Sequence, residues 1–229
     1  MIELKFFGHS AVGIKTDAVK ILIDPFLEGN PLVKECPESI EVDVICVTHG
    51  HGDHVGDTEK LAQKNDALVI APFELATYLD MKGCTVHPMH IGGARNFDWG
   101  RIKLVPALHG SAFIEDGGKI VYTGNPCGFL LTLEGKTIYH AGDTGLSAEM
   151  EIIGRMNTID LALLPIGDNF TMGPDDAAEA VRMLKPKQVV PIHFNTWDVI
   201  AQNPDGFAKK VAGMTRVQII PPGDSIQLT

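Results

Sequence analysis

The chain has 229 residues, of which 45% are hydrophobic and 21% charged, and this composition is typical of globular proteins rather than disordered ones. Its net charge of −10 disfavours a nucleic-acid partner, because nucleic-acid binders neutralise phosphates with a surplus of Lys and Arg. No apolar run approaches the roughly 18 residues of a membrane-spanning helix, and the first residues lack a signal-peptide pattern. We therefore expect a cytoplasmic protein with no membrane partner.

The first half of the chain is predicted to begin as a meander of short strands and to continue with strands and helices. Closely spaced β-type runs with Gly or Asp between them favour the meander. Apolar spacing bounded by Pro and Gly favours the helices. The expected strands are 2–7, 11–16, 19–23, 42–47 and 67–71; the expected helices are 57–65 and 72–82; and 26–40 is expected to be a loop.

The second half is predicted to repeat this order. Strands are expected at 101–107, 128–133, 136–141, 159–166, 188–192, 217–220 and 225–228, and helices at 147–156 and 175–184. His87 and His90 are expected in a surface loop, and His140 in the core. Val19–Ile23, which ends at Asp24, corresponds to Thr137–Ala141, which leads to Asp143.

This parallel between the halves predicts two β-sheets, each covered by helices, as a four-layer α/β/β/α sandwich. No linker rich in Pro, Gly or Ser separates the halves. We therefore predict a single domain over residues 1–229.

The strongest chemical signal is His49-x-His51-x-Asp53-His54, directly after a strongly apolar strand. Alternate residues of an extended loop point the same way, so His49 and His51 can share one ion. Asp53 and His54 would then face a neighbouring position. Imidazole and carboxylate are ligands that zinc and similar ions prefer, and the intervening glycines allow a tight turn.

Three further polar residues follow predicted strands at comparable positions. They are His109, Asp143 and His193. Functional groups collect on loops at strand ends because the scaffold holds them there. We therefore expect all three to join the His-rich loop.

These residues, in this order, resemble the metallo-β-lactamase superfamily. The segments Gly8-His9-Ser10, Leu22-Ile23-Asp24-Pro25 and Phe170-Thr171-Met172-Gly173-Pro174 resemble its branch of uncharacterised metal-dependent hydrolases, near the L-ascorbate-6-phosphate lactonases. The resemblance covers nearly the whole chain and implies the αββα sandwich. Because Asp143 stands where true β-lactamases of this fold commonly have Cys, antibiotic hydrolysis is not expected.

The resemblance also implies a centre with two divalent metal ions, zinc in the first place and manganese or iron as alternatives. The first ion would be held by His49, His51 and His109. The second would be held by Asp53, His54 and His193. Asp143 would bridge both, and Asp24 would accept hydrogen bonds that orient the ligand loop. His9 and Asn195 are further candidates for substrate contact, and the Asp168–Met172 loop is a candidate cap.

Two such ions can share a hydroxide that attacks a carbonyl or phosphorus centre, with Asp53 as the catalytic residue that holds the proton. We expect a metal-dependent hydrolase of a small anionic or neutral ester, lactone or phosphate ester. The alternatives are an iron-dependent redox enzyme on the same ligands, an RNA-processing nuclease, and a metal-binding protein without turnover. A homo-oligomer is left open.

Overall fold

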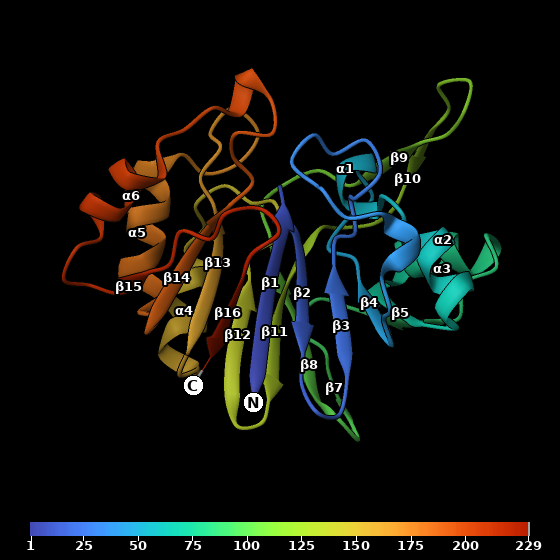
Figure 1. Cartoon of the computed structure of the whole chain (residues 1–229), viewed down its shortest axis with the longest axis horizontal. Coiled ribbons are helices and arrows are strands. Elements are labelled where there is room, and N and C mark those ends of the chain that lie inside the picture. The colour runs from blue at the N-terminus through green and yellow to red at the C-terminus, as the bar shows by residue number, and fades with distance from the viewer. Residues whose placement is uncertain (229) are drawn as a thin grey trace.

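The computed structural model describes residues 1–228, which form two seven-stranded sheets (Figure 1). The first sheet has the order β16-β1-β2-β3-β4-β5-β6. Its strands are β1 (Ile2–Gly8), β2 (Ala11–Lys15), β3 (Lys20–Ile23), β4 (Val44–Cys46), β5 (Leu68–Pro72), β6 (Val86–Met89) and β16 (Ser225–Leu228).

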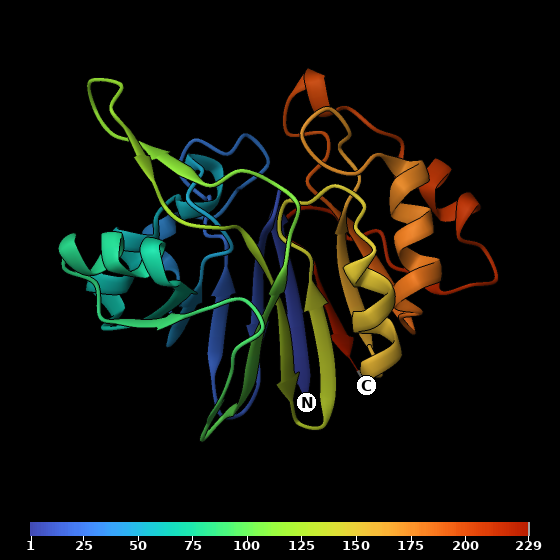
Figure 2. The same cartoon turned by 180° about the vertical axis from the view of Figure 1, so that it is seen from behind.

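The second sheet has the order β15-β14-β13-β12-β11-β8-β7. Its strands are β7 (Ala94–Phe97), β8 (Gly100–Pro106), β11 (Cys127–Leu133), β12 (Lys136–His140), β13 (Leu161–Pro165), β14 (Gln188–Ile192) and β15 (Arg216–Val217). A separate two-stranded ribbon, β9 (Ala112–Ile114) and β10 (Ile120–Tyr122), projects from one end of the molecule (Figures 1 and 2).

Helices cover the outer faces of the sheets (Figure 2). The first sheet carries α2 (Thr58–Asn65) and α3 (Phe73–Met81), and the second carries α4 (Glu149–Met156), α5 (Pro174–Leu184) and α6 (Pro204–Lys210). Between the sheets, one apolar cluster joins residues of both, including Leu4 and Ile14 from the first sheet and Leu104 and Phe129 from the second. This arrangement is the αββα sandwich expected from the sequence.

The two sheets share a pairing pattern. In the first, β1, β2 and β3 are antiparallel and β3 to β6 are parallel. In the second, β7, β8, β11 and β12 are antiparallel and β12 to β15 are parallel. Hence β3 corresponds to β12 and β4 to β13, as the duplication in the sequence pattern predicted. The ends of β3, β4, β12 and β14 meet at one edge of the sandwich, where the candidate ligands lie.

Several elements were not expected from the sequence: β6, β7, β9, β10, α6 and the short helix α1 (Gly52–Val55). The prediction that His87 lies in a loop is wrong, because His87 is part of β6 and is half-buried. Pro88 made this segment look irregular, but β6 is the edge strand of its sheet, where proline is tolerated. None of the helices in residues 1–228 combines the length and apolar character needed to cross a membrane.

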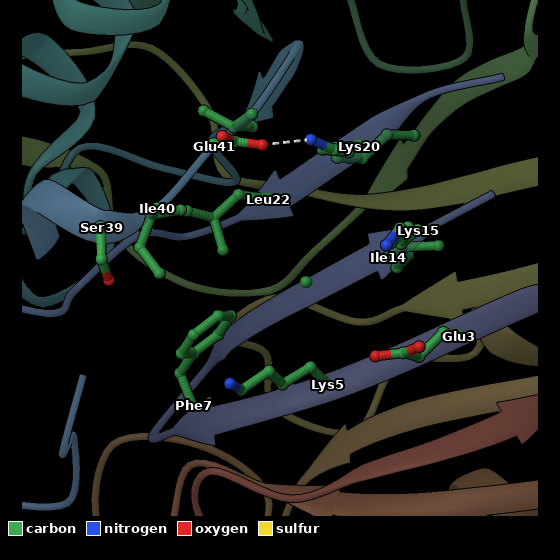
Figure 3. Close-up of a pocket in the computed structure, with 13 residues that line it drawn as sticks. Glu3, Lys5, Phe7, Ile14, Lys15, Lys20, Leu22, Ser39, Ile40 and Glu41 are labelled. Atoms are coloured by element: carbon green, nitrogen blue, oxygen red, sulfur yellow. Dashed lines mark hydrogen bonds and ion pairs between the residues drawn. The ribbon is translucent and has the colours of Figure 1, made fainter. Parts of the chain in front are cut away.

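A groove of about 290 Å³ lies on the outer face of β1 to β3 (Figure 3). Two of its lysines are paired with carboxylates: Lys5 Nζ lies 2.7 Å from Glu35 Oε1, and Lys20 Nζ lies 2.5 Å from Glu41 Oε2. Among the described residues, no His or Cys lines this groove. It therefore offers no imidazole or thiol ligand, unlike the histidine cluster described below.

Candidate metal centre

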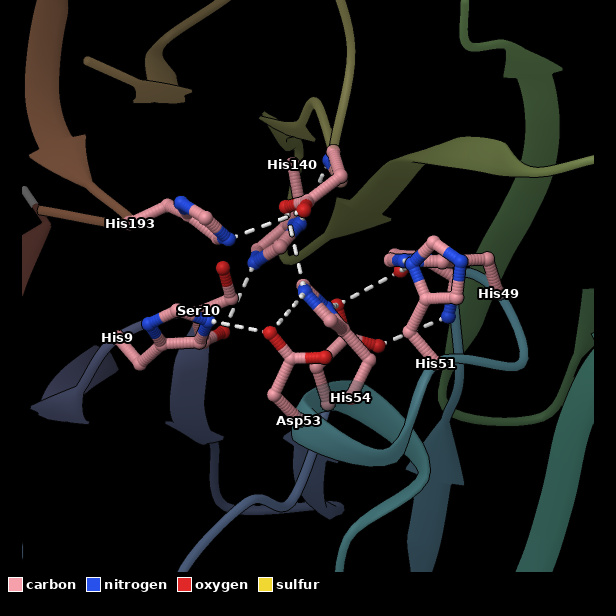
Figure 4. Close-up of polar contacts among 12 residues, drawn as sticks. His9, Ser10, His49, His51, Asp53, His54, His140 and His193 are labelled. Carbon is pink, nitrogen blue, oxygen red and sulfur yellow. Dashed lines mark hydrogen bonds and ion pairs between the residues drawn. The ribbon is translucent and has the colours of Figure 1, made fainter. Parts of the chain in front are cut away.

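The seven residues expected as ligands come from five places in the chain and meet at one edge of the sandwich. Five of them, His49, His51, Asp53, His54 and His193, are labelled in Figure 4. His49 and His51 follow β4, and His109 follows β8. Asp143 follows β12, and His193 follows β14. The remaining two, Asp53 and His54, lie on α1 (Gly52–Val55), a single helical turn.

The expectation that the whole His-rich segment is extended is therefore wrong beyond His51. His51 itself is extended, with φ −69° and ψ 148°, and the helical turn begins at the next residue. Gly50 allows the backbone of this segment to pack closely against the Thr123 side chain, because a Cβ atom at position 50 would lie 2.0 Å from Thr123 Oγ1. Gly52 has no such neighbour within 4 Å, so its position accepts a side chain.

Three imidazoles form a first group. His51 Nδ1 lies 2.9 Å from His49 Nε2 and 3.3 Å from His109 Nε2. Two nitrogens bound to one tetrahedral zinc ion at about 2.0–2.1 Å would be about 3.3 Å apart. The three nitrogens therefore already converge at the spacing that one ion requires.

Asp143 connects this group to the other ligands. Its Oδ2 lies 3.0 Å from His193 Nε2 and 3.6 Å from His109 Nε2, and its Oδ1 lies 3.3 Å from His54 Nε2. Asp53 Oδ2 lies 4.0 Å from His54 Nε2. The carboxylate of Asp143 thus stands between a first position near His109 and a second near His193.

Two buried atoms in this cluster fit a bound cation. Among residues 1–228, His54 Nε2 and Asp143 Oδ1 are buried and lie 3.3 Å apart, but neither makes a hydrogen bond of good geometry. Buried polar atoms in native proteins rarely lack a partner. An ion at this position would satisfy both atoms, and mixed nitrogen and oxygen ligands suit zinc, manganese and iron.

Asp24 orients two candidate ligands, His49 and His54, through hydrogen bonds on the side away from the cluster. Its Oδ1 accepts a hydrogen bond from the Thr48 backbone N–H at 2.8 Å, and its Oδ2 accepts from Thr48 Oγ1 and from His54 Nδ1, each at 2.8 Å. Since the Thr48 hydroxyl donates to Asp24, its oxygen accepts from His49 Nδ1 at 2.9 Å. Both histidines are thereby oriented with Nε2 toward the cluster, the atom that would bind an ion.

The His9 side chain lies within the histidine cluster and is hydrogen-bonded to the candidate ligand Asp53. Because a carboxylate only accepts, His9 Nε2 donates to Asp53 Oδ2 at 3.2 Å, and His9 Nδ1 accepts from Thr196 Oγ1 at 2.8 Å. Burial lowers the pKa of His9 to about 4 against the opposing effect of Asp53, so the ring is neutral at pH 7. Its role is therefore to hold Asp53.

The electrostatics of the cluster favour a cation. Burial lowers the pKa of His49 well below its ordinary value, so this ligand is neutral. Burial acts the same way on His54, but the charges of Asp143 and Asp24 outweigh it and raise the His54 pKa. Burial would raise the pKa of Asp143, yet His54 and His193 hold it well below its usual range. The buried carboxylates need a positive charge beside them, which a divalent cation can supply.

Three residues of the centre have strained backbones. His9, Asp24 and His193 have φ values of 57°, 47° and 53°, in the left-handed region that non-glycine residues rarely adopt. Such strain persists only where the surrounding structure enforces it, and it gathers at functional sites. The backbone N–H of His193 donates to the His9 carbonyl at 2.7 Å, which joins two of these strained segments.

A cavity of about 460 Å³ opens beside the cluster. Its lining residues are His51, Asp53, His109, Asp143, Phe170, His193, Trp197 and Val199. Phe170 belongs to the loop expected as a cap. Asn195 is not part of the lining: it is exposed, and its Oδ1 accepts from the Gln202 backbone N–H at 2.7 Å, so its contact with substrate stays a prediction.

The sequence analysis missed Thr48, Thr196 and two apolar residues of the lining, Trp197 and Val199. Thr48 could have been suspected because it directly precedes His49. Thr196, Trp197 and Val199 had no comparable signal, since their segment shows no hydrophobic period. His140 is buried, with Nδ1 accepting from the Gly142 N–H at 3.1 Å, and it is absent from the cavity lining, as expected of a core residue.

Comparison with known proteins places this geometry in a family. A family model described as beta-lactamase superfamily domain matches residues 19–194. A relative from Anoxybacillus flavithermus, named UPF0173 metal-dependent hydrolase, is 59% identical over 227 residues, which are 99% of this chain and 100% of the relative.

Solved structures agree with this placement. The structure of Igni18, described as a novel metallo hydrolase from Ignicoccus hospitalis, matches with a TM-score of 0.90 and 37% identity, covering 98% of this chain and 97% of the other. CmlA, a diiron β-hydroxylase from Streptomyces venezuelae, matches with a TM-score of 0.76 over 99% of this chain and 54% of its own. At 14% identity the second match shows a shared fold alone.

Proposed function

The chain belongs to the metallo-β-lactamase superfamily, in the family of UPF0173 metal-dependent hydrolases, and from this premise we propose that it is a dinuclear hydrolase of a small ester, lactone or phosphate ester. The observation that supports two ions is the position of Asp143. Its Oδ2 lies within 3.6 Å of a histidine from each group, His109 and His193. Zinc as the metal and a cytoplasmic location belong to the same proposal.

The candidate ligands would form two sets, one for each ion. His49, His51 and His109 would hold one ion; His54, His193 and Asp53 would hold the other; and Asp143 would bridge them. When bound, such ions would supply activation of a water molecule near neutral pH and stabilisation of the negative charge that develops on the substrate oxygen.

Asp53 has the second task of handling a proton. It lines the cavity, its side chain is 29% exposed, and His9 fixes its Oδ2. From there it accepts the proton of the attacking group and passes it to the leaving oxygen. For an ester, one carbon–oxygen bond forms from water and the acyl–oxygen bond breaks, which yields a carboxylic acid and an alcohol.

The test is hydrolysis by protein loaded with zinc or manganese. The panel contains p-nitrophenyl butyrate, γ-butyrolactone and bis(p-nitrophenyl) phosphate. We expect turnover of at least one compound, loss of that turnover in Asp143→Ala, and retention in Asp160→Asn, a carboxylate in contact with Thr137 and Lys187 rather than with the ligands. Turnover that survives Asp143→Ala would contradict the proposal.

The iron-dependent redox alternative shares the ligand set, because imidazole and carboxylate also suit iron. It predicts visible absorption bands and oxygen consumption with the iron-loaded protein. If these accompany an absence of hydrolysis across the panel, the redox function replaces the hydrolase.

A further inference from the structure

One side of the cavity is apolar and has no task in the proposed chemistry. It consists of Phe170, from the loop between β13 and α5, and of Trp197 and Val199, from the segment after β14. These large side chains are 52%, 40% and 54% exposed. We name them the apolar wall. Apolar surface exposed beside convergent polar groups is the usual composition of a ligand pocket.

The segment that carries Trp197 and Val199 is held in place by hydrogen bonds. The Ile200 N–H donates to the Trp197 carbonyl at 3.0 Å, and the Asn195 N–H donates to the Ile200 carbonyl at 3.0 Å. Ile200 is fully buried. The ring of Trp197 lies 5.0 Å from the ring of His9, nearly edge-on. The two hydrogen bonds and the buried Ile200 side chain therefore fix this segment with Trp197 and Val199 exposed to solvent.

Phe170 is anchored beside the metal ligands. Its loop is closed by the Asp168 N–H, which donates to the Met172 carbonyl at 3.0 Å. The Met172 N–H donates in turn to the Thr144 carbonyl at 2.9 Å, one residue after Asp143. The loop thus has a fixed position relative to the bridging carboxylate.

The described lining of the cavity also has no cationic side chain that would pair with a phosphate. Among residues 1–228, no Lys or Arg lines it. Apart from the proposed ions, a phosphate would need such side chains or a helix N-terminus, and a charge placed against apolar side chains loses hydration without compensation. An uncharged substrate with an apolar group avoids that cost and covers the wall instead.

We propose that the substrate is an uncharged ester or lactone whose apolar group packs on Phe170, Trp197 and Val199. This inference rests on the proposed hydrolase function and selects one substrate class within it. The reacting carbonyl would lie at the metal cluster, beside Asp53, and the apolar group would extend along the wall.

The kinetic test uses metal-loaded protein with p-nitrophenyl acetate, butyrate and hexanoate, and with p-nitrophenyl phosphate. Burial of each added methylene is expected to raise kcat/KM about fourfold, and the phosphate is expected to be the poorest substrate. In Phe170→Ala, the increase in kcat/KM with each added methylene is expected to be less than twofold. The matched control is Phe73→Ala, at a phenylalanine on α3 that is 47% exposed and outside the cavity, and it should keep the full gain.

A binding test remains informative if no ester is hydrolysed. In Trp99→Phe, Trp197 is the only tryptophan, and its fluorescence reports on the wall. We expect a saturable change with hexanamide, a weaker one with acetamide, and loss of the difference when Phe170→Ala is added. If the protein binds hexanamide in this way but hydrolyses no ester, the result contradicts the hydrolase proposal and leaves the apolar binding site supported.

Two results would overturn the substrate proposal. One is turnover that depends on Asp143 but shows no rise along the ester series, together with equal responses to both amides. The other is a Phe170→Ala variant that changes the oligomeric state and leaves the gain per methylene unchanged, because a second copy would then cover the wall.

Discussion

Replacing Asp24 by Asn tests how the ligand histidines are oriented. Asparagine keeps one acceptor oxygen for the Thr48 backbone N–H but presents an NH₂ group where Thr48 Oγ1 and His54 Nδ1 now donate. Two of three hydrogen bonds to a fully buried carboxylate are lost. At about 1.5–3 kcal/mol for each bond to a charged group, the free energy of unfolding should fall by about 3–6 kcal/mol.

The same substitution should weaken metal binding by about 10- to 100-fold, because such outer hydrogen bonds fix the ligand ring and its tautomer. Urea unfolding measures the first effect, and zinc titration against a competing chelator measures the second. Asp43→Asn is the matched control: Asp43 Oδ2 accepts from the Lys20 backbone N–H at 2.7 Å and touches no ligand. A folded Asp24→Asn protein with the zinc affinity of the control would refute the role of Asp24.

Three further substitutions give separate tests. His9→Asn removes the donor to Asp53, so kcat should fall by about 10- to 100-fold while the metal content stays the same by elemental analysis. Gly50→Ala places a Cβ against Thr123 and should lower the free energy of unfolding by about 1–3 kcal/mol in urea, whereas Gly52→Ala should have no measurable cost. The Lys187 and Thr137 hydrogen bonds hold the pKa of Asp160 below its ordinary value against burial. Wild type should therefore be more stable than Asp160→Asn above about pH 4, and this advantage should shrink as the pH falls through the lowered pKa; a constant difference would contradict it.

The fold and the ligand set could be predicted because their signals are local in sequence. Apolar strands such as Val42–Val47 end directly in the residues that carry the chemistry, and a parallel sheet brings those ends to one edge. In the structure each of four residues follows a strand, and their side chains lie in one cluster: His49, His109, Asp143 and His193. Their roles as metal ligands stay a prediction until metal binding is measured.

The missed features depend on contacts that no short segment encodes. The helical turn α1 has four residues, too few to show a helical period. Asn195 turns away because its backbone is left-handed, with φ 59°, a conformation that asparagine tolerates. The neighbouring Thr196 reaches His9 instead. The apolar wall comes from two loops that only the tertiary fold brings together.

The number of metal ions bound per chain tests the central claim most directly. Elemental analysis of protein purified without chelator, then saturated with zinc and freed of unbound metal, should give two ions per chain. Asp143→Ala should bind fewer, because the carboxylate that contacts both groups is gone. One ion per chain in the wild type, or two in Asp143→Ala with unchanged affinity, would contradict the dinuclear centre.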